Sequence, residues 1–417
     1  MVKIKTIKAI EILDSRGNPT LRTFVILDDG TVAFSSIPSG ASTGSHEAVE
    51  LRDKDPKRYG GNGVLNAINN VSSIIAPKLI NLELVKLDVL DKLMIELDGT
   101  ENKSRLGANA ILSVSQALIK ALAASKKIPL WQFINQYYFS EIKPAFPKIM
   151  FNVVNGGKHA NWNFDIQEFI VIPQRQLASE SIKVGAEIYQ AIKKNLKEKN
   201  LSILVGDEGG FSPALKSNQE AFQLIIESAV QAGYENEKDF KLGIDAAASE
   251  FFKDGKYILK KDNRLISGED LIKYYLSLAE KYQVYSFEDV FQEDDWPNWQ
   301  NFMKRLVTDE KLSLVIGDDL FCTNVKRMKT GQEKKSANAV IIKPNQIGTI
   351  WETIEAIKLA QKNNWAVIIS HRSGETEDSF IADLAYAAAA DFLKTGAPAR
   401  SERLAKYNRL IEIENRL

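Results

Sequence analysis

Cysteine, histidine and any imbalance of charge are what this 417-residue chain lacks or has least of. Its single cysteine, Cys322, cannot form an internal disulfide, which excludes a small domain held together by disulfides. Lysine plus arginine and aspartate plus glutamate number 54 each, so there is no basic excess to favour nucleic acid or anionic lipid. No apolar run approaches the ~20 residues of a membrane-spanning helix. Residues 1–5 alternate charged and apolar side chains, unlike a signal peptide, and we expect a cytoplasmic location.

The first third of the chain has the pattern of a small α+β domain. Alternating and apolar segments predict a three-stranded meander at residues 3–13, 20–27 and 31–37. The dipeptide Asp29-Gly30 is a favourable hairpin turn before the third strand. Apolar residues at three- and four-residue spacing then predict helices at 64–79, 85–97 and 106–124. Prolines within 126–146 indicate a connection, so we expect an N-terminal domain at 1–128, a connection at 129–146 and a second domain at 147–417.

The second domain repeats a short apolar run, a polar residue and a helix-like stretch. Eight such runs predict strands at 149–154, 166–172, 201–205, 241–244, 284–287, 312–316, 339–342 and 366–369. Strands that alternate with helices form parallel sheets, and eight of them favour a closed α/β barrel. Between residues 154 and 166 there is no room for a crossover helix. We therefore expect the first two barrel strands to form an antiparallel hairpin.

Charged residues recur where these strands end. They are Glu168, Glu208, Asp245, Glu288, Asp318, Lys343 and His371, with Lys394 as a further candidate. In an α/β barrel the functional groups gather at the face where the strands end. One such residue is unremarkable, because most surface charges are simply solvated. Seven at successive strand ends predict one charged site at the barrel mouth.

Three of these carboxylates favour a metal site. Asp245, Glu288 and Asp318 come from consecutive predicted strands and offer only oxygen ligands. Hard carboxylate ligands suit Mg²⁺, which keeps open positions for water and substrate oxygens. Any one of the three could instead be an acidic N-cap of the following helix, a reading that is less economical for all three together. Asp319 follows Asp318 directly, and the sequence leaves open which of them faces the metal.

Basic residues form the opposite half of the expected site. Lys343 and Lys394 offer compact charges, and Arg372 can bind a phosphate through two parallel hydrogen bonds. The segment 371–374 precedes a helix-like stretch whose amide groups would favour an anion. A site with Mg²⁺ on one side and these cations on the other fits a small, strongly anionic substrate such as a phosphorylated carboxylic acid.

Two glycine-bearing loops complete the picture. Residues 39–44 resemble a phosphate loop but lack the G-x-x-x-x-G-K-[ST] spacing, and no G-x-G-x-x-G occurs, so a nucleotide site is not supported. Residues 155–159 form the second loop, which carries His159. Either pattern alone is more often a plain surface turn than a functional loop.

With these residues in view, the sequence resembles the enolase family along its whole length. The strings that carry the resemblance are 39–44, 46–53, 155–160, 167–169, 206–210, 245–251, 288–289, 317–320, 343–348, 370–378 and 394–396. Small departures occur at Pro344, where an apolar residue is expected, and at Lys158 and Trp162 in a variable loop. The resemblance implies an eight-stranded α/β barrel of the enolase type, with a smaller α+β N-terminal domain.

The resemblance also implies an activity, that of a carbon–oxygen lyase which reversibly dehydrates 2-phosphoglycerate to phosphoenolpyruvate in glycolysis and gluconeogenesis. Two Mg²⁺ ions would be required, one held by Asp245, Glu288 and Asp318 and one by Ser39 with substrate oxygens. A lysine or histidine base with Mg²⁺ is the general scheme of that superfamily.

Roles for the remaining residues follow from the same resemblance. Lys343 would be the general base and Glu208 the general acid. Arg372 and Ser373 would bind the phosphate and Lys394 the carboxylate. The full set expected to bind substrate is His159, Gln167, Glu168, His371, Arg372, Ser373 and Lys394. A homodimer or an assembly of dimers is the implied oligomer.

Two other readings stay open at this point. One is a different Mg²⁺-dependent enzyme of the same superfamily, such as a racemase or sugar-acid dehydratase. Those enzymes typically carry a Lys-x-Lys pair on the second barrel strand, where this chain has Ile166-Gln167-Glu168. The other is a non-catalytic binding protein on the same fold, which the loss of a charged site residue would mark. None of the expected charged residues is missing.

Overall fold

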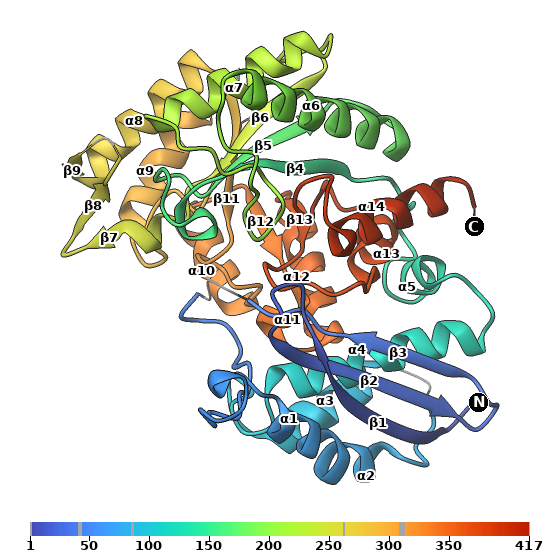
Figure 1. Ribbon diagram of the computed structural model, residues 1–417. Coiled ribbons are helices and arrows are strands. Elements are labelled where there is room, and N and C mark those ends of the chain that lie inside the picture. Colours follow the sequence, from blue (N-terminus) through green and yellow to red (C-terminus); the bar gives the residue numbers. More distant parts are fainter. Residues whose placement is uncertain (1, 41–43, 85–86, 262, 308–312, 417) are drawn as a thin grey trace.

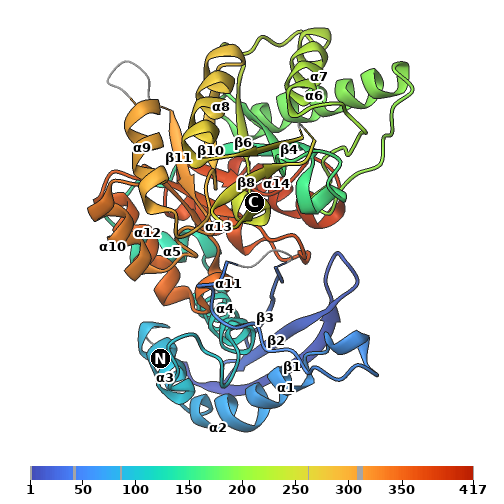
Figure 2. The same ribbon diagram turned by 90° about the vertical axis from the view of Figure 1, so that its left-hand side faces the viewer.

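The computed structural model describes residues 2–40, 44–84, 87–261, 263–307 and 313–416. Figure 1 shows an N-terminal sheet-and-helix unit below a larger barrel that is surrounded by helices. In the view turned by 90°, helices α4 (Ala108–Ser125) and α11 (Pro344–Ile347) lie where the two units meet (Figure 2). The expected fold class, an enolase-type barrel with a smaller α+β domain, is confirmed.

The N-terminal unit begins with the predicted antiparallel meander, β1 (Ile4–Leu13), β2 (Pro19–Leu27) and β3 (Val32–Ser36). The turn before β3 contains Gly30 at a φ of 87°, a conformation that glycine adopts without a steric penalty. The helices that follow are α1 (Leu65–Asn70), α2 (Ala76–Leu79), α3 (Leu87–Asp98) and α4. The 3₁₀ turn η1 (Tyr59–Gly61) precedes α1, and the π-helical η2 (Val71–Ile75) joins α1 to α2. Residues 85 and 86 of the predicted second helix lie outside the described residues. The expected connection 129–146 contains a further helix, α5 (Leu130–Tyr138).

Helix α4 is the central helix of this unit. Almost all of its side chains are buried, because one face packs on β2 and β3 and another on α3 and the barrel side. Among the described helices it alone is long and apolar enough to cross a membrane, yet 83% of its residues are buried inside the fold. That burial is what a core helix requires.

The barrel is closed by eight strands in the order β10-β11-β12-β13-β14-β4-β5-β6. Their bounds are β4 (Lys148–Asn155), β5 (Glu168–Pro173), β6 (Phe240–Asp245), β10 (Val284–Glu288), β11 (Leu314–Gly317), β12 (Ala339–Ile342), β13 (Ala366–Ser370) and β14 (Phe392–Lys394). Strand β5 is antiparallel to both of its neighbours, β4 and β6, and the other pairs are parallel. The predicted antiparallel hairpin of the first two strands is confirmed.

One predicted strand was wrong. Residues 201–205 are outside the barrel and make only an isolated bridge from Val205 to Phe211. Leu204 in this run is 75% exposed, so its apolar side chains are not part of the barrel core. The eighth strand is instead β14, whose three residues are too few for a recognisable strand pattern. Strand β11 begins at Leu314, and residue 312 of that prediction lies outside the described residues.

Two cores stabilise the barrel. Inside it, alternate strand residues form one apolar layer of Met150, Ile170, Ile172, Leu314, Ile316, Ala339, Ile341, Ile368 and Phe392. Their neighbours along each strand, such as Ile342 and Ile369, point outward to the helices. This apolar layer fills the interior of the barrel away from its mouth.

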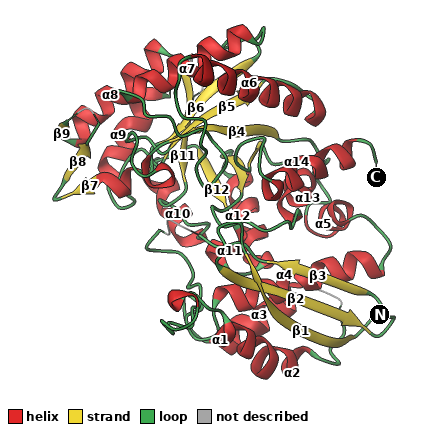
Figure 3. Ribbon diagram, in the orientation of Figure 1, coloured by secondary structure: helices red, strands yellow, loops and turns green. Residues whose placement is uncertain are grey.

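Helices cover the outside of the barrel, as Figure 3 shows in red around yellow strands. They are α6 (Ala178–Glu198), α7 (Asn218–Gln231), α8 (Gly268–Lys281), α9 (Trp296–Leu306), α10 (Val325–Lys334), α12 (Ile350–Lys362), α13 (Phe380–Ala387) and α14 (Ser401–Glu414). A small sheet, β7 (Phe252–Lys253), β8 (Lys256–Leu259) and β9 (Arg264–Ile266), and the 3₁₀ turns η3 (Gly157–Ala160) and η4 (Ala248–Phe251) lie in the loops.

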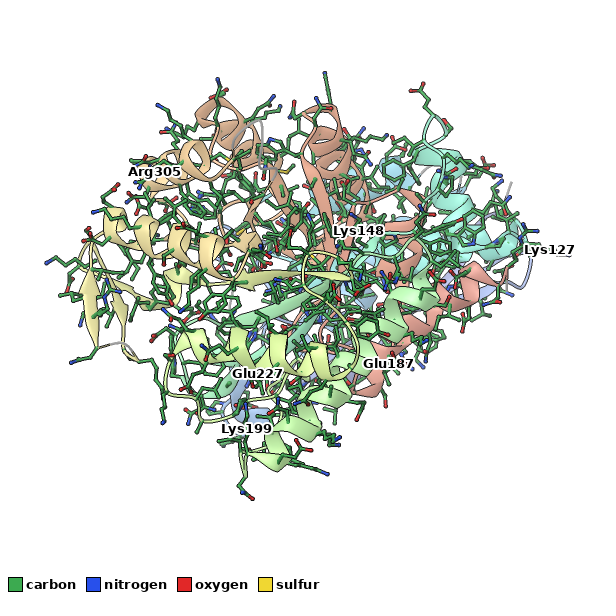
Figure 4. The ribbon with its side chains drawn as sticks, turned by 90° about the horizontal axis from the view of Figure 1, so that it is seen from above. Lys127, Lys148, Glu187, Lys199, Glu227 and Arg305 are labelled. Atoms are coloured by element: carbon green, nitrogen blue, oxygen red, sulfur yellow. The ribbon has the colours of Figure 1, made fainter. Side chains whose placement is uncertain are left out.

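Exposed charged residues mark the outside of the molecule away from the N-terminal domain. Figure 4 views the molecule from above and labels Lys148, the exposed first residue of β4. It also labels Lys199 and Glu227, which form an ion pair of 2.6 Å between the end of α6 and α7. The expected site residues lie at the opposite end, toward the N-terminal domain.

Candidate active site

Parallel strands bring their last residues to one mouth. Asp245, Glu288 and Lys394 are the last residues of β6, β10 and β14. Asp318, Lys343 and His371 directly follow β11, β12 and β13. Because β5 runs in the opposite direction, its first residue, not its last, reaches the same mouth. That residue is Glu168, which pairs in register with Asp245 of β6.

Glu208 reaches the mouth by another route. It lies in the turn that follows Val205, not at the end of a barrel strand as the sequence suggested. Gly209 takes a φ of 88°, and the backbone of Gly206 bonds to that of Gly210 at 2.9 Å, which closes the turn. Tyr189 of α6 donates a hydrogen bond of 2.7 Å to the Gly209 carbonyl and holds it against the barrel.

These residues surround one small cavity. It is lined by His159, Gln167, Glu168, Glu208, Asp245, Asp318, Lys343, Ser370, His371, Arg372, Ser373 and Lys394. Eleven of these twelve were expected from the sequence, the exception being Ser370. Their side chains are almost wholly polar, so the cavity suits a small charged molecule and not an apolar one.

Lys394 occupies the floor of the cavity. Its Nζ lies 2.7 Å from Glu288 Oε1 and 3.2 Å from Asp245 Oδ2. It also lies 3.0 Å from Glu168 Oε2. Burial alone would lower the pKa of Lys394, but these carboxylates hold its pKa well above the ordinary value. Lys394 is therefore a fixed cation among carboxylates.

A second lysine lies nearby. The Lys343 ammonium pairs with Asp318 Oδ2, and Gln346 donates a hydrogen bond of 2.9 Å to Asp318 Oδ1. Burial disfavours both charges, but the attraction between them lowers the pKa of Asp318 and raises that of Lys343. Lys343 keeps its proton while this ion pair persists.

The neighbouring aspartates have a different role. Asp289 accepts hydrogen bonds from the backbone N–H groups of Asp318 at 2.9 Å and Asp319 at 2.8 Å. Asp318 lines the cavity, whereas Asp319 is not among its lining residues. Cys322 is buried, and its thiol donates to the Asp319 carbonyl over 3.2 Å. It is a small packed side chain.

The carboxylates fit a divalent cation by chemistry and charge. Asp245, Glu288 and Asp318 face only two lysines, which leaves an excess of negative charge in a buried site. Glu288 Oε2 is buried and makes no hydrogen bond. Burial and the nearby Asp245 raise the pKa of Glu288 well above its usual range. A hard cation would satisfy this oxygen and remove that penalty.

The expected metal ligands are not drawn together into one tight group. In the described part of the chain, the close groups of possible metal ligands at the mouth are His159–Glu168–Glu208 and Asp289–Asp318–Asp319. Asp245, Glu288 and Asp318 do not form such a group; Lys394 pairs with the first two and Lys343 with the third.

Three uncharged side chains surround the Glu208 carboxylate: two donate hydrogen bonds to it and the third lies close to it. Asn152 donates to its Oε2 over 3.1 Å and Ser373 to its Oε1 over 3.2 Å. His371 Nε2 lies 3.3 Å from Oε2. Burial lowers the pKa of His371 to about 3, so the ring is neutral and acts through a hydrogen bond. Burial alone would raise the pKa of Glu208, but His371, His159 and Arg403 beside it hold its pKa well below the usual range.

Glu168 behaves in the opposite way. Burial and the negative charge of Glu208 raise its pKa well above the usual range. The two carboxylates and His159 offer atoms that all lie within 4.8 Å of one another. Two buried carboxylates this close do not both ionise readily. Of the two carboxyl groups, Glu168 is therefore the one that holds a proton more readily.

Arg372 is positioned from the N-terminal domain. Glu47 accepts hydrogen bonds from its Nη1 over 2.8 Å and its Nη2 over 3.1 Å. Asn345 accepts a further bond from Nη1 over 3.1 Å. The guanidinium is thus fixed at the cavity wall before any anion binds.

Ser39 was expected to contribute to a second metal shell, but it does not line the cavity. Its hydroxyl donates to Asp14 over 3.3 Å and accepts from Arg16 and Arg52, each over 3.1 Å. Its backbone forms a bridge with Gly374. Ser39 therefore fixes the start of its loop to the barrel. Residues 41–43 of the same loop lie outside the described residues.

Several contributing residues were not singled out from the sequence. Glu47, Asn152, Gln346 and Arg403 all contact predicted site residues. Asn152 gave a weak signal, because it is a polar residue inside an otherwise apolar strand run. Arg403 gave none, since one arginine in a charged amphipathic helix looks like any other.

Comparison with known families agrees with this geometry. A family model described as the N-terminal domain of enolase matches residues 4–134. A second, described as the C-terminal TIM barrel domain of enolase, matches residues 143–417. Together they account for nearly all of the chain, with the barrel match covering the cavity residues. The chain therefore belongs to the enolase family.

Proposed function

We propose that the protein catalyses the reversible dehydration of 2-phosphoglycerate to phosphoenolpyruvate. The observation that carries the proposal is the arrangement of charge in one small cavity. Arg372 and two lysines face a set of buried carboxylates, at the mouth of a barrel that belongs to the enolase family. A dianionic phosphate and a carboxylate on a three-carbon substrate match such a cavity in charge.

Binding uses the cations at the cavity wall. Arg372, already fixed by Glu47, would receive the phosphate together with Ser373. Lys394 would approach the substrate carboxylate from the cavity floor. His159, Gln167 and His371 would complete the lining and exclude water. Fixed donors of this kind bind the substrate without a further cost of reorganisation.

Lys343 is the proposed base for the proton at C2. Removing that proton leaves a second negative charge on the substrate carboxyl group, and Mg²⁺ bound by Asp245, Glu288 and Asp318 would stabilise it. A lysine accepts a proton only in its neutral form. Engaging Asp318 as a ligand would weaken its pairing with Lys343, and Lys394 and Arg372 nearby would then lower the Lys343 pKa.

The Glu168–Glu208 pair is the proposed source of the second proton. A departing hydroxide must be protonated, and Glu208 was assigned this role by resemblance. In the free cavity Glu168 holds a proton more readily than Glu208 does. We propose that substrate binding moves this proton to Glu208. Contacts from Asn152, Ser373 and His371 direct the Glu208 carboxyl group into the cavity.

The rival superfamily activities have less support. Racemases and related dehydratases use lysines on the second barrel strand, whereas β5 begins with Glu168 and contains no lysine. Loss of a charged site residue would mark a non-catalytic binding protein, and every expected charged residue is present. Two Mg²⁺ per site and a homodimer or assembly of dimers remain proposals that rest on the resemblance. A cytoplasmic location remains a proposal that rests on the sequence alone.

The direct test is an assay of the purified protein. With 2-phosphoglycerate and Mg²⁺ we expect phosphoenolpyruvate to form, and phosphoenolpyruvate should be hydrated in the reverse direction. A panel of sugar acids and amino-acid derivatives should give no turnover. Turnover of a panel member without any conversion of 2-phosphoglycerate would favour another superfamily activity, and no turnover at all would favour a binding role.

A further inference from the structure

Arg403 lies outside the cavity, yet it connects two of the segments that form it. Its side chain is fully buried on α14. Its guanidinium donates to the carbonyl oxygens of Arg372 over 2.5 Å and Ser373 over 2.6 Å. It also donates to the carbonyl of Asp207 over 3.2 Å. One side chain thus ties the segment that follows β13 to the turn that carries Glu208.

The same guanidinium contacts a histidine. Arg403 Nη1 lies 2.6 Å from His371 Nδ1. A guanidinium only donates hydrogen bonds, so Nδ1 must accept and cannot carry a proton. In a neutral imidazole the proton is then on Nε2, which is the nitrogen 3.3 Å from Glu208 Oε2. Arg403 therefore selects the tautomer that donates to Glu208.

Without this contact the ring would have two choices. The opposite tautomer would place a lone pair on Nε2 against a Glu208 oxygen, which is repulsive and leaves one carboxylate bond unmade. A doubly protonated ring would place a full charge beside Glu208 and favour its ionised form. Either change would alter the ease with which Glu208 takes up a proton.

We infer that Arg403 is a positioning residue that fixes His371 as the Nε2–H tautomer and so sets the hydrogen bond that Glu208 receives. Neither the family match nor the sequence analysis assigns Arg403 a role. Its predicted effect on catalysis rests on the proposed function, whereas its effect on His371 does not.

The chain offers an unusually simple readout, because it has only three histidines, His46, His159 and His371. We would record long-range ¹H–¹⁵N spectra of the full protein labelled at histidine nitrogen and assign His371 with His371→Asn. In the wild type we expect His371 as a neutral Nε2–H ring throughout pH 5–9, because burial and the positive charges of Arg403 and Lys394 lower its pKa to about 3 in spite of Glu208. A wild-type ring that carries its proton on Nδ1, or that titrates near pH 6.5, would overturn the inference without any mutant of Arg403.

Variants then test the cause. Arg403→Met removes the donor, and we expect a mixed tautomer or protonation of His371 within pH 5–9. Arg403→Lys restores a donor and should restore the Nε2–H signal at least in part. Arg409→Met is the matched control, since Arg409 lies on the same helix but pairs with Asp383. Arg409→Met should leave the His371 spectrum unchanged. An unchanged His371 spectrum in folded Arg403→Met would contradict the inference. If Arg403→Met does not fold, the wild-type and Arg403→Lys spectra still decide it.

Kinetic measurements on the Arg403 variants provide a separate test. If the proposed function holds, Arg403→Met should lower kcat about tenfold or more and shift the pH profile, with a smaller change in KM. Equal loss in Arg403→Met and Arg403→Lys, with a normal His371 spectrum in both, would mean that Arg403 is merely structural. Absence of any dehydration by the wild type would contradict the proposed function and leave the spectroscopic result to be judged by itself.

Discussion

Lys394 Nζ lies 2.7 Å from Glu288 Oε1, on the floor of a cavity that contains more buried carboxylates than cations. The other oxygen of Glu288 makes no hydrogen bond. Lys394 therefore neutralises only part of the negative charge of these carboxylates. The remaining charge is the physical reason to expect a divalent cation there.

The first prediction concerns that cation. Chelation should abolish dehydration of 2-phosphoglycerate and added Mg²⁺ should restore it. Asp245→Ala should raise the Mg²⁺ requirement steeply, because Glu288 and Asp318 alone would hold the ion poorly. Calorimetry of Mg²⁺ binding checks the cause directly. Full activity in excess chelator would reject the metal site.

The second prediction separates base from acid. Lys343→Ala should lose about 100- to 10,000-fold in turnover and should no longer exchange the C2 hydrogen of 2-phosphoglycerate with solvent. Glu208→Gln removes the acid but keeps the base, so it should form little phosphoenolpyruvate yet still exchange C2 hydrogen for deuterium. Mass spectrometry of recovered substrate measures both.

Glu168→Gln extends this test to the carboxylate pair. If the pair shares one proton, this variant should also make little product while exchange continues, because the amide cannot supply a proton. Exchange retained in Lys343→Ala but lost in Glu208→Gln would reverse the assignment. Normal turnover in Glu168→Gln would show that Glu208 alone supplies the proton.

The third prediction concerns Ser39. Its hydroxyl joins Asp14, Arg16 and Arg52 in a buried network, so Ser39→Ala should destabilise the protein by about 1–3 kcal/mol. Affinity for the first Mg²⁺ should be unchanged, since Ser39 does not line the cavity. Thermal unfolding and calorimetry provide the two measurements. Exposed Ser202→Ala is the control, and a collapse of Mg²⁺ affinity in Ser39→Ala would contradict the structural role.

The fourth prediction is a pH dependence far from the cavity. Asp91 of α3 accepts hydrogen bonds through Oδ2 from Ser115 and from the Trp351 N–H of α12, each over 2.9 Å. Burial raises its pKa to about 7, against about 3.9 in an unfolded chain. Between these values the folded state binds more protons than the unfolded state. The contribution of Asp91 to stability should therefore fall as pH rises from about 4 to 7, by up to about 4 kcal/mol.

Asp91→Asn checks this sign. The amide resembles the protonated acid, keeps an acceptor oxygen for Ser115 and Trp351, and does not ionise. We expect the variant to melt close to the wild type at pH 5 and clearly above it at pH 8. Asp88→Asn, on the same helix but partly exposed beside Lys92, should show no such divergence. A Tm difference that does not change with pH would contradict the prediction.

Most of the barrel could be predicted from the sequence, and the one wrongly predicted strand has a clear cause. Residues 201–205 have the composition of a buried strand but are exposed, whereas β14 is too short to show a pattern. Local sequence records which residues favour a strand, not whether a place in the sheet is free. The reversed direction of β5 was predictable, because the loop before it is too short for a crossover helix.

The sequence by itself determined the family, the alternation of strands and helices, and the identity of nearly every residue around the cavity, because those features depend on local pattern and on residue type. Only the tertiary structure decided how the charges combine. It paired Lys394 with Glu288, placed Ser39 outside the cavity and brought Arg403 onto His371. Hydrogen bonds and charge interactions act over a few ångströms between residues far apart in the chain, so their partners exist only once the fold is complete.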